Sequence, residues 1–269
     1  MFMIKKIIPR SIKERIRFIL HQKKIREVKK IFDKSAKSPA WLDYNDFEIL
    51  NKKYPPIKTQ TYDIESVNSR AKVRSKKLLK IMSEKMYDVL EIGCYDAMVS
   101  AELQLAGKNT TAIDIRKWIN DDAKKANVKH YIMDAQQMDF NDNSFDFAFT
   151  IDGFEHFEKP DKVFQEAHRV LKKDGLFYVS FGCCYHSAKH LHIYKYINIP
   201  YVHLLFERKT IDKYIEKNKL QPVDYNTINY WTNSQFKKLW SDYKNKFEII
   251  KFKQNLNLNN LDIIAKYPS

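Results

Sequence analysis

Acidic residues and a glycine stand where short apolar runs of the sequence end. The run Val89–Ile92 contains Glu91 and leads into Gly93, and two later runs end at Asp114 and Asp134. The carboxyl ends of parallel strands share one sheet edge, where a glycine lets the backbone approach a ligand closely. An acid about twenty residues after such a glycine can accept hydrogen bonds from both hydroxyls of a ribose. Their order and spacing therefore predict a site for a nucleoside cofactor.

A second group of residues could move a proton. Asp152, Glu155 and His156 follow the fourth apolar run, Phe145–Ile151. Imidazole suits general-base work at neutral pH, so we predict that His156 is the base and that the two acids raise its basicity. Two carboxylates and an imidazole also suit Mg²⁺ or Mn²⁺, although a divalent metal is not the expected requirement. The structural alternative is that Glu155 and His156 cap or brace the next helix.

Imidazole and aromatic side chains are concentrated after the fifth apolar run. An extended chain would place His190 and His192 on one face, whereas a helix would pair His186 with His190. Metal binding there is disfavoured because paired acids are absent nearby. Aromatic faces stack on sugar rings, and imidazoles bond to hydroxyl or phosphate oxygens. We therefore predict a pocket for the acceptor, formed by His186, His190, His192 and Tyr194.

The elements that must position these residues alternate along the chain. We predict strands at Asp88–Ile92, Thr110–Ile115, Val128–Met133, Phe145–Ile151 and Leu176–Phe181, and helices at Ile64–Met82, from Met98, and at Asp161–Leu171. This alternation indicates an α/β protein with a doubly wound, mostly parallel sheet between two helical layers. Phe247–Phe252 and Leu261–Lys266 are predicted to add an antiparallel pair, which makes the sheet seven-stranded.

The chain length allows one large core with additions. We predict a basic helical arm and a lid or connector at residues 1–60, and a cofactor-binding core at 61–182. An insertion after the fifth strand, residues 183–245, would bind the acceptor. Residues 246–269 would complete the core sheet.

The ordered motifs resemble the class I, Rossmann-like S-adenosylmethionine-dependent methyltransferases over about residues 60–182. The resemblance extends to Phe154-Glu155-His156-Phe157 after the fourth strand and to Leu171-Lys172-Lys173-Asp174-Gly175-Leu176 before the fifth. It implies S-adenosylmethionine as cofactor and S-adenosylhomocysteine as product. It also implies a cofactor site formed by Glu91, Gly93, Asp114, Ile115, Asp134 and Ala135. Glu91 and Gly93 would border the methionine part, Asp114 would hold the ribose, and Asp134 with Ala135 would face the adenine.

The turn after the first strand departs from the family pattern. Tyr95 and Ala97 stand where further glycines are common. A positive φ at Tyr95 would cost on the order of 1 kcal/mol. We interpret the turn as degenerate but functional, with loss of cofactor binding as the alternative.

Most of the net charge of +15 lies in one segment. Thirteen Lys or Arg and three acids between Met1 and Ser38 give this arm a charge of +10. A basic amphipathic helix packed on the main domain is the favoured interpretation, and peripheral association with an anionic membrane surface is the alternative. Because most of the charge excess lies in the arm and no RNA-binding module flanks the core, nucleic acid is not the expected partner.

The number and spacing of the cysteines and the hydropathy of the chain indicate the cellular compartment. Cys94, Cys183 and Cys184 are an odd number, and two of them are adjacent, which disfavours a disulfide framework. No apolar run approaches the roughly 20 residues of a membrane span, and no secretory signal is evident. We expect a cytoplasmic protein, with the inner membrane surface as the alternative location.

The expected function is O-methyl transfer to a small or glycan-linked acceptor. The segment His190–Phe206 resembles one in methyltransferases associated with bacterial surface-polysaccharide synthesis, and the basic surface suits an acceptor bearing phosphate, carboxylate or phosphoramidate. An RNA methyltransferase is the second hypothesis. Base-amine methyltransferases often carry an Asn/Asp-Pro-Pro-aromatic signature, whereas Pro55-Pro56 lies upstream of the cofactor turn. A non-catalytic methyltransferase-like scaffold is the third hypothesis.

Overall fold

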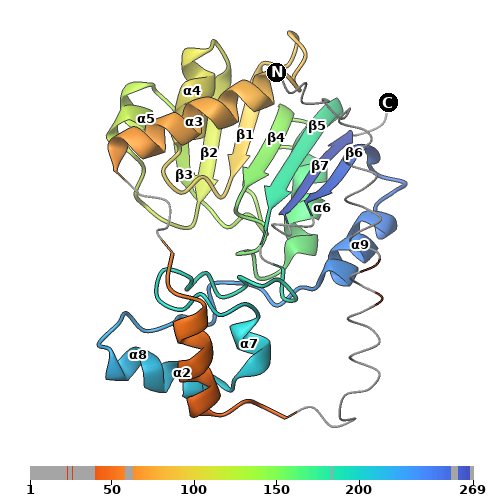
Figure 1. Cartoon of the computed structure of the whole chain (residues 1–269). Helices are drawn as coiled ribbons and strands as arrows, with labels where there is room; N and C mark the ends of the chain where they lie inside the picture. Colours follow the sequence, from red (N-terminus) through yellow and green to blue (C-terminus); the bar gives the residue numbers. More distant parts are fainter. Residues whose placement is uncertain are drawn as a thin grey trace, which may run out of the picture. The chain divides into compact units, whose positions relative to one another are not determined.

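A parallel sheet forms the centre of the protein in the computed structural model (Figure 1). The structure describes residues 23, 26, 40–57, 63–182, 184–255 and 260–266. The parallel strands are β1 (Asp88–Ile92), β2 (Asn109–Asp114), β3 (Lys129–Ile132), β4 (Phe145–Ile151) and β5 (Leu171–Phe181), in the order β3-β2-β1-β4-β5. This arrangement confirms the α/β class and the predicted parallel sheet. Apart from Lys23 and Arg26, the basic arm, Met1–Ser38, lies outside the described residues, as does Cys183.

The C-terminal part of the chain extends this sheet beyond β5. The segment β7 (Asn260–Lys266) pairs antiparallel with β5, and β6 (Glu248–Asn255) pairs antiparallel with β7. The full order is β3-β2-β1-β4-β5-β7-β6. The chain therefore returns to the β5 edge after the long stretch that follows β5.

Helices cover both faces of the sheet because the strand residues alternate between two apolar clusters. Val89 and Phe147 belong to the cluster that includes residues of α3, α4 and α5, whereas Leu90 and Ala148 belong to the cluster that includes residues of α6 and α9. Figure 1 shows α3, α4 and α5 together on one side of the strands. These helices are α3 (Ile64–Leu79), α4 (Met98–Leu105), α5 (Asp121–Lys125), α6 (Pro160–Val170) and α9 (Asn233–Asp242).

A third apolar cluster joins the connector to the segment after β5. It is centred on α2 (Tyr44–Lys53), α7 (Val202–Leu205) and α8 (Arg208–Lys217). Phe47 of α2 is fully buried, and its ring centre lies 5.1 Å from those of Phe206 and Tyr214. Of the two interpretations of the connector, these contacts favour a packing segment.

The segment after β5 differs in two respects from the sequence interpretation. Residues 184–200 form consecutive turns, so neither the extended nor the helical alternative for the histidines describes the backbone. In addition, α9 was expected to belong to the insertion, but Phe236, Leu239 and Trp240 pack in the same cluster as the strands and α6.

The length and apolarity of the helices decide whether one of them could span a membrane. Within the part of the chain that the structure describes, none combines the length and apolarity needed to cross a bilayer.

Candidate active site

The turn between β1 and α4 has an unusual backbone. Gly93, Tyr95 and Ala97 all have positive φ, at +70°, +51° and +56°. A Cβ at Gly93 would lie 3.2 Å from the ring of Phe157, so the close packing of this ring as well as the backbone requires glycine. Tyr95 therefore adopts the left-handed conformation whose cost the sequence analysis considers, and it does so without glycine.

Asp114 lies at the carboxyl end of β2, beside this turn. Its Oδ2 accepts a hydrogen bond from the Tyr95 backbone N–H at 2.9 Å, and its Oδ1 accepts one from the Arg116 N–H at 2.9 Å. A carboxylate oxygen can accept two hydrogen bonds, so each oxygen retains capacity for one more. Two acceptor positions on one oriented carboxylate suit a pair of vicinal hydroxyls.

Glu91 is buried beneath the same turn. Its Oε2 accepts hydrogen bonds from the Ser100 backbone N–H at 3.1 Å and from the Ser100 hydroxyl at 2.6 Å, which ties β1 to the first turn of α4. Burial, with a contribution from nearby Asp96, raises the pKa of Glu91 to about 8. Glu91 is therefore largely protonated at neutral pH, and its visible contacts are with α4.

The remaining predicted cofactor residues differ in exposure. Ile115 is 74% exposed, directly after Asp114. Asp134 is exposed at the end of β3, where Gln136 donates backbone and side-chain hydrogen bonds to its carboxylate. Ala135 is buried in the apolar cluster on the α6 face, so its side chain contributes to the core.

Asp152, Glu155 and His156 follow β4, but their side chains have different surroundings. Asp152, which has a φ of +53°, pairs with Arg74 of α3. Glu155 is 3% exposed, accepts a long hydrogen bond of 3.4 Å from the Gly182 N–H on Oε1, and has its Oε2 buried without a hydrogen-bond partner. The expectation that both acids support His156 directly is not borne out by these contacts.

Burial and the negative charge of Asp152 raise the pKa of Glu155 to about 8. Arg74 opposes this shift, and it acts on Glu91 in the same direction. The guanidinium of Arg74 thus interacts with the carboxyl groups of Glu91, Asp152 and Glu155, which lie near the carboxyl ends of β1 and β4.

His156 is exposed and contacts the segment after β5. Its Nδ1 lies 2.5 Å from the carbonyl oxygen of Thr227, and its ring centre lies 5.6 Å from that of His192 in an edge-to-face arrangement. Because a carbonyl can only accept, Nδ1 must carry the proton in this contact, which leaves Nε2 unprotonated in the neutral ring. The geometry selects the tautomer that a general base needs.

His192 has a strained backbone and a shifted pKa. Its φ is +56°, a conformation that is rare for residues other than glycine. Burial, with smaller contributions from His156 and His190, lowers the pKa of His192 to about 4. This imidazole is therefore neutral at physiological pH and does not repel a proton on His156.

The loop that contains Thr227 is fastened to the loop after β4 by Asn229. The Asn229 backbone N–H donates to the Glu155 carbonyl at 2.7 Å, and its side-chain amide donates to the carbonyls of Phe154 and Phe157, both at 2.9 Å. These hydrogen bonds hold Thr227 beside His156 although the two residues are far apart in the sequence.

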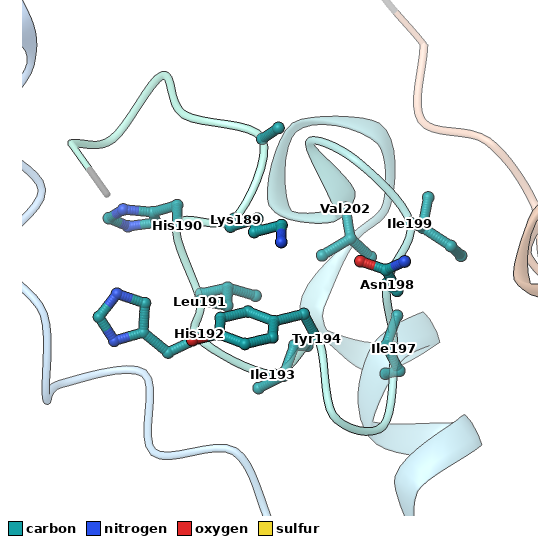
Figure 2. Close-up of a pocket in the computed structure, with 11 residues that line it drawn as sticks. Lys189, His190, Leu191, His192, Ile193, Tyr194, Ile197, Asn198, Ile199 and Val202 are labelled. Atoms are coloured by element: carbon teal, nitrogen blue, oxygen red, sulfur yellow. The ribbon is translucent and has the colours of Figure 1, made fainter. Parts of the chain in front are cut away.

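A small pocket lies in the turns of residues 188–202 (Figure 2). Lys189, His190, His192, Tyr194 and Asn198 contribute its polar lining, and the Lys189 Nζ lies 4.9 Å from the centre of the Tyr194 ring. Figure 2 shows the imidazoles of His190 and His192 on the same side of the backbone, and the two rings are close enough to interact electrostatically. The extended alternative predicted this common side, although the backbone is not a strand.

The other two predicted acceptor residues differ from each other. His190 is buried, with its ring 4.7 Å from that of His203 and 5.3 Å from that of Tyr185. His186 is exposed and packs against Tyr185. The structure brings His190, His192 and Tyr194 to the pocket and His192 to His156, whereas His186 remains at the surface.

Three residues of this site were missed by the sequence analysis. Arg74 appears in the sequence as one of many bases on a polar helix, and Thr227 and Asn229 lie in a loop without a recognisable motif. The three acid and imidazole residues after β4 do not converge, and among the described residues no group of three or more His, Cys, Asp or Glu is arranged to hold a metal ion.

Comparison with known proteins places the site in a family context. Residues 90–179 match the family model described as a methyltransferase domain. Among solved structures, the chain resembles a protein from Pyrococcus horikoshii OT3 at 20% identity, with 80% of this chain and 98% of that chain covered and a TM-score of 0.53. This likeness supports the Rossmann-like α/β fold. A comparison with curated proteins finds no significant match.

Two further solved structures match this chain with lower TM-scores. An S-adenosylmethionine-dependent methyltransferase from Methanosarcina mazei has 22% identity, with 71% of this chain and 97% of that chain covered and a TM-score of 0.49. A Burkholderia thailandensis 1,6-didemethyltoxoflavin-N1-methyltransferase, solved with 1,6-didemethyltoxoflavin and S-adenosylhomocysteine, has 13% identity, with 87% and 94% covered and a TM-score of 0.49. The region that matches the methyltransferase-domain model includes most of β1, Asp114 and the loop after β4, so the predicted cofactor residues and His156 lie within the matched region.

Proposed function

We propose that this S-adenosylmethionine-dependent methyltransferase transfers a methyl group to a hydroxyl of a small or glycan-linked acceptor, and that His156 is the general base. One observation carries the proposal. The contact between His156 Nδ1 and the Thr227 carbonyl fixes a base-competent tautomer at the sheet edge where the cofactor residues lie.

The residues at the carboxyl ends of β1, β2 and β3 fit the cofactor chemically. When bound, S-adenosylmethionine supplies an electrophilic methyl group on a positively charged sulfur. Asp114 offers two remaining acceptor positions for the ribose hydroxyls, and Ile115 offers an exposed apolar surface beside it. In this proposal Asp134 and Ala135 border the adenine, while Glu91 and Gly93 shape the floor of the methionine part.

The chemical step asks little of the protein beyond alignment and proton removal. The bound cofactor would supply the methyl group to the acceptor oxygen, and its sulfur would keep the electron pair of the broken bond. The hydroxyl proton goes to His156 Nε2 and then to solvent, because the imidazole is exposed. Neutral His192 beside it allows His156 to accept the proton without like-charge repulsion.

Asp152 and Glu155 have positioning roles in this proposal. Asp152 anchors the loop to α3 through Arg74, and Glu155, which is buried, supports the backbone to which Asn229 binds. Their effects on His156 are therefore transmitted through the loop.

The pocket of residues 188–202 supports a polar, ring-containing acceptor. Lys189 brings a cation beside the aromatic face of Tyr194, and His192 joins this pocket to His156. An aromatic face and a cation suit a sugar ring that carries an anionic group. We further propose that His186 and His190 contribute to this side and that the acceptor belongs to bacterial surface-polysaccharide synthesis.

Methyl transfer from labelled S-adenosylmethionine to a panel of acceptors tests the function. The panel contains nucleotide sugars, phosphorylated and neutral oligosaccharides, and RNA, and mass spectrometry locates the added methyl group. We expect label on a sugar or sugar-linked oxygen. Label on an RNA base would support the RNA methyltransferase alternative, and label on nitrogen of a small molecule would contradict O-methylation.

A further inference from the structure

Three large side chains gather at the surface beside Asp114. The guanidinium carbon of Arg116 lies 4.9 Å from the centre of the Tyr95 ring, and the Trp118 ring lies 6.2 Å from it in an edge-to-face arrangement. Tyr95 is 45% exposed and Trp118 is 57% exposed. We call Tyr95, Arg116 and Trp118 the aromatic platform.

The platform is connected to the proposed ribose ligand through the backbone. The same two residues whose side chains stack, Tyr95 and Arg116, donate their backbone N–H groups to the two oxygens of Asp114. The loops that carry them are also joined, because the Asn120 N–H donates to the Asp96 carbonyl at 3.0 Å. The side chains of the platform therefore have a fixed place relative to the carboxylate.

The backbone conformation of Tyr95 in this arrangement is strained and raises the free energy of the folded state. Its φ of +51° is a conformation that glycine adopts freely and that other residues adopt with strain. Strained residues of this kind cluster at ligand-binding sites, where the surrounding structure holds them in place. A large aromatic side chain at such a position either obstructs the ligand or contacts it.

We propose that the aromatic platform covers the adenosine half of the bound cofactor, in place of the close backbone approach that glycine would allow at position 95. Aromatic rings and guanidinium groups stack on planar bases, and such stacking contributes substantially to nucleoside binding. This inference rests on the proposed position of the ribose at Asp114.

A pair of substitutions separates stacking from relief of strain. Tyr201 is a matched control, because it has a φ of +59°, is 43% exposed and begins α7 in the segment after β5. Tyr95→Gly and Tyr201→Gly relieve the same kind of strain, and both variants should remain folded. Isothermal calorimetry with S-adenosylhomocysteine should show about tenfold weaker binding for Tyr95→Gly and wild-type binding for Tyr201→Gly and Tyr95→Phe.

Tryptophan fluorescence gives a second readout that does not depend on turnover. S-adenosylhomocysteine should change the emission of the wild type, and Trp118→Phe should remove that change. Wild-type affinity in Tyr95→Gly, with weakened binding in Asp114→Ala, would overturn the platform and retain the cofactor site. Wild-type affinity in both variants would remove the cofactor site and the platform together.

Discussion

The proposed cofactor side and the proposed acceptor side of the site are constructed differently. On the cofactor side, Gly93 and Asp114 lie at the ends of adjacent parallel strands, and backbone N–H groups orient the carboxylate. On the acceptor side, the pocket of residues 188–202 lies in consecutive turns, and its connection to the core depends on His192 and Asn229.

This difference separates two tasks of a group-transfer enzyme. Strand ends are placed by the sheet, so one cofactor site can be maintained while loops vary. Turns can change their side chains with little effect on the core, so they suit a site that selects among acceptors. His156 stands between the two, because its backbone follows β4 and its imidazole contacts Thr227.

The largest expected effect is at this junction. His156→Ala should lower turnover by roughly 10²–10⁴-fold, since a positioned base is lost, while calorimetric affinity for S-adenosylmethionine stays at the wild-type value. Glu158→Ala, an exposed acid two residues further along the same loop, is the control and should retain turnover. Near-normal turnover in His156→Ala would mean that alignment alone drives the reaction or that another imidazole is the base.

We expect Glu155 to make the free energy of unfolding depend on pH by a few kcal/mol. Its pKa is about 8 in the folded protein, against 4.5 as the ordinary value, so the folded state binds the proton more tightly. Its contribution to stability is fully present below about pH 4.5 and is lost as the pH rises through about 8.

Glu155→Gln should therefore flatten the fall in the free energy of unfolding between about pH 5 and pH 9, as measured by denaturant titration. Buried Glu91 has a pKa raised in the same direction, so part of the fall should remain. Glu158→Gln should keep the wild-type profile. An unaltered profile in Glu155→Gln would show that the carboxyl group is ionised in the folded protein at neutral pH.

On the cofactor side the expected effect is smaller and is confined to binding. Asp114→Ala should weaken S-adenosylmethionine binding by about 1–3 kcal/mol, because the ribose hydroxyls lose their acceptor. Calorimetry measures this loss, and Asp121→Ala, an exposed acid of α5, should bind as the wild type does. Equal affinities in the two variants would contradict the ribose assignment.

The smallest expected effect lies in the connection between the two sides. Asn229→Ala removes the two side-chain hydrogen bonds to the carbonyls of Phe154 and Phe157 and should lower stability by about 1–2 kcal/mol. Turnover should fall severalfold while cofactor affinity is maintained, because Thr227 is less firmly held. Asn226→Ala, exposed in the same loop, is the control. Reduced cofactor affinity in Asn229→Ala would show that the two sides are not separable.

The cofactor side could be predicted from the sequence because its signals are local. Strand ends follow from apolar runs, and the sequence separation between Gly93 and Asp114 corresponds to one helix and one strand. The family pattern marks Tyr95 as a departure in this turn, and the structure gives Tyr95 a positive φ.

The acceptor side could not be predicted in the same way because its contacts join distant segments. Nothing in the sequence indicates that the Thr227 carbonyl fixes the tautomer of His156 or that Asn229 binds the loop after β4. Burial likewise separates Glu155 from the adjacent His156, although their types and spacing favour a joint role. Periodicity also fails in residues 184–200, because turns have none.

A crystal structure with S-adenosylhomocysteine tests the central claim most directly. The claim is that the cofactor edge and the acceptor side meet at His156. We predict that the ribose hydroxyls bind Asp114 and that the sulfur faces His156, with room between sulfur and Nε2 for one acceptor oxygen. A ribose bound away from Asp114, or a sulfur separated from His156 by protein atoms, would contradict the account.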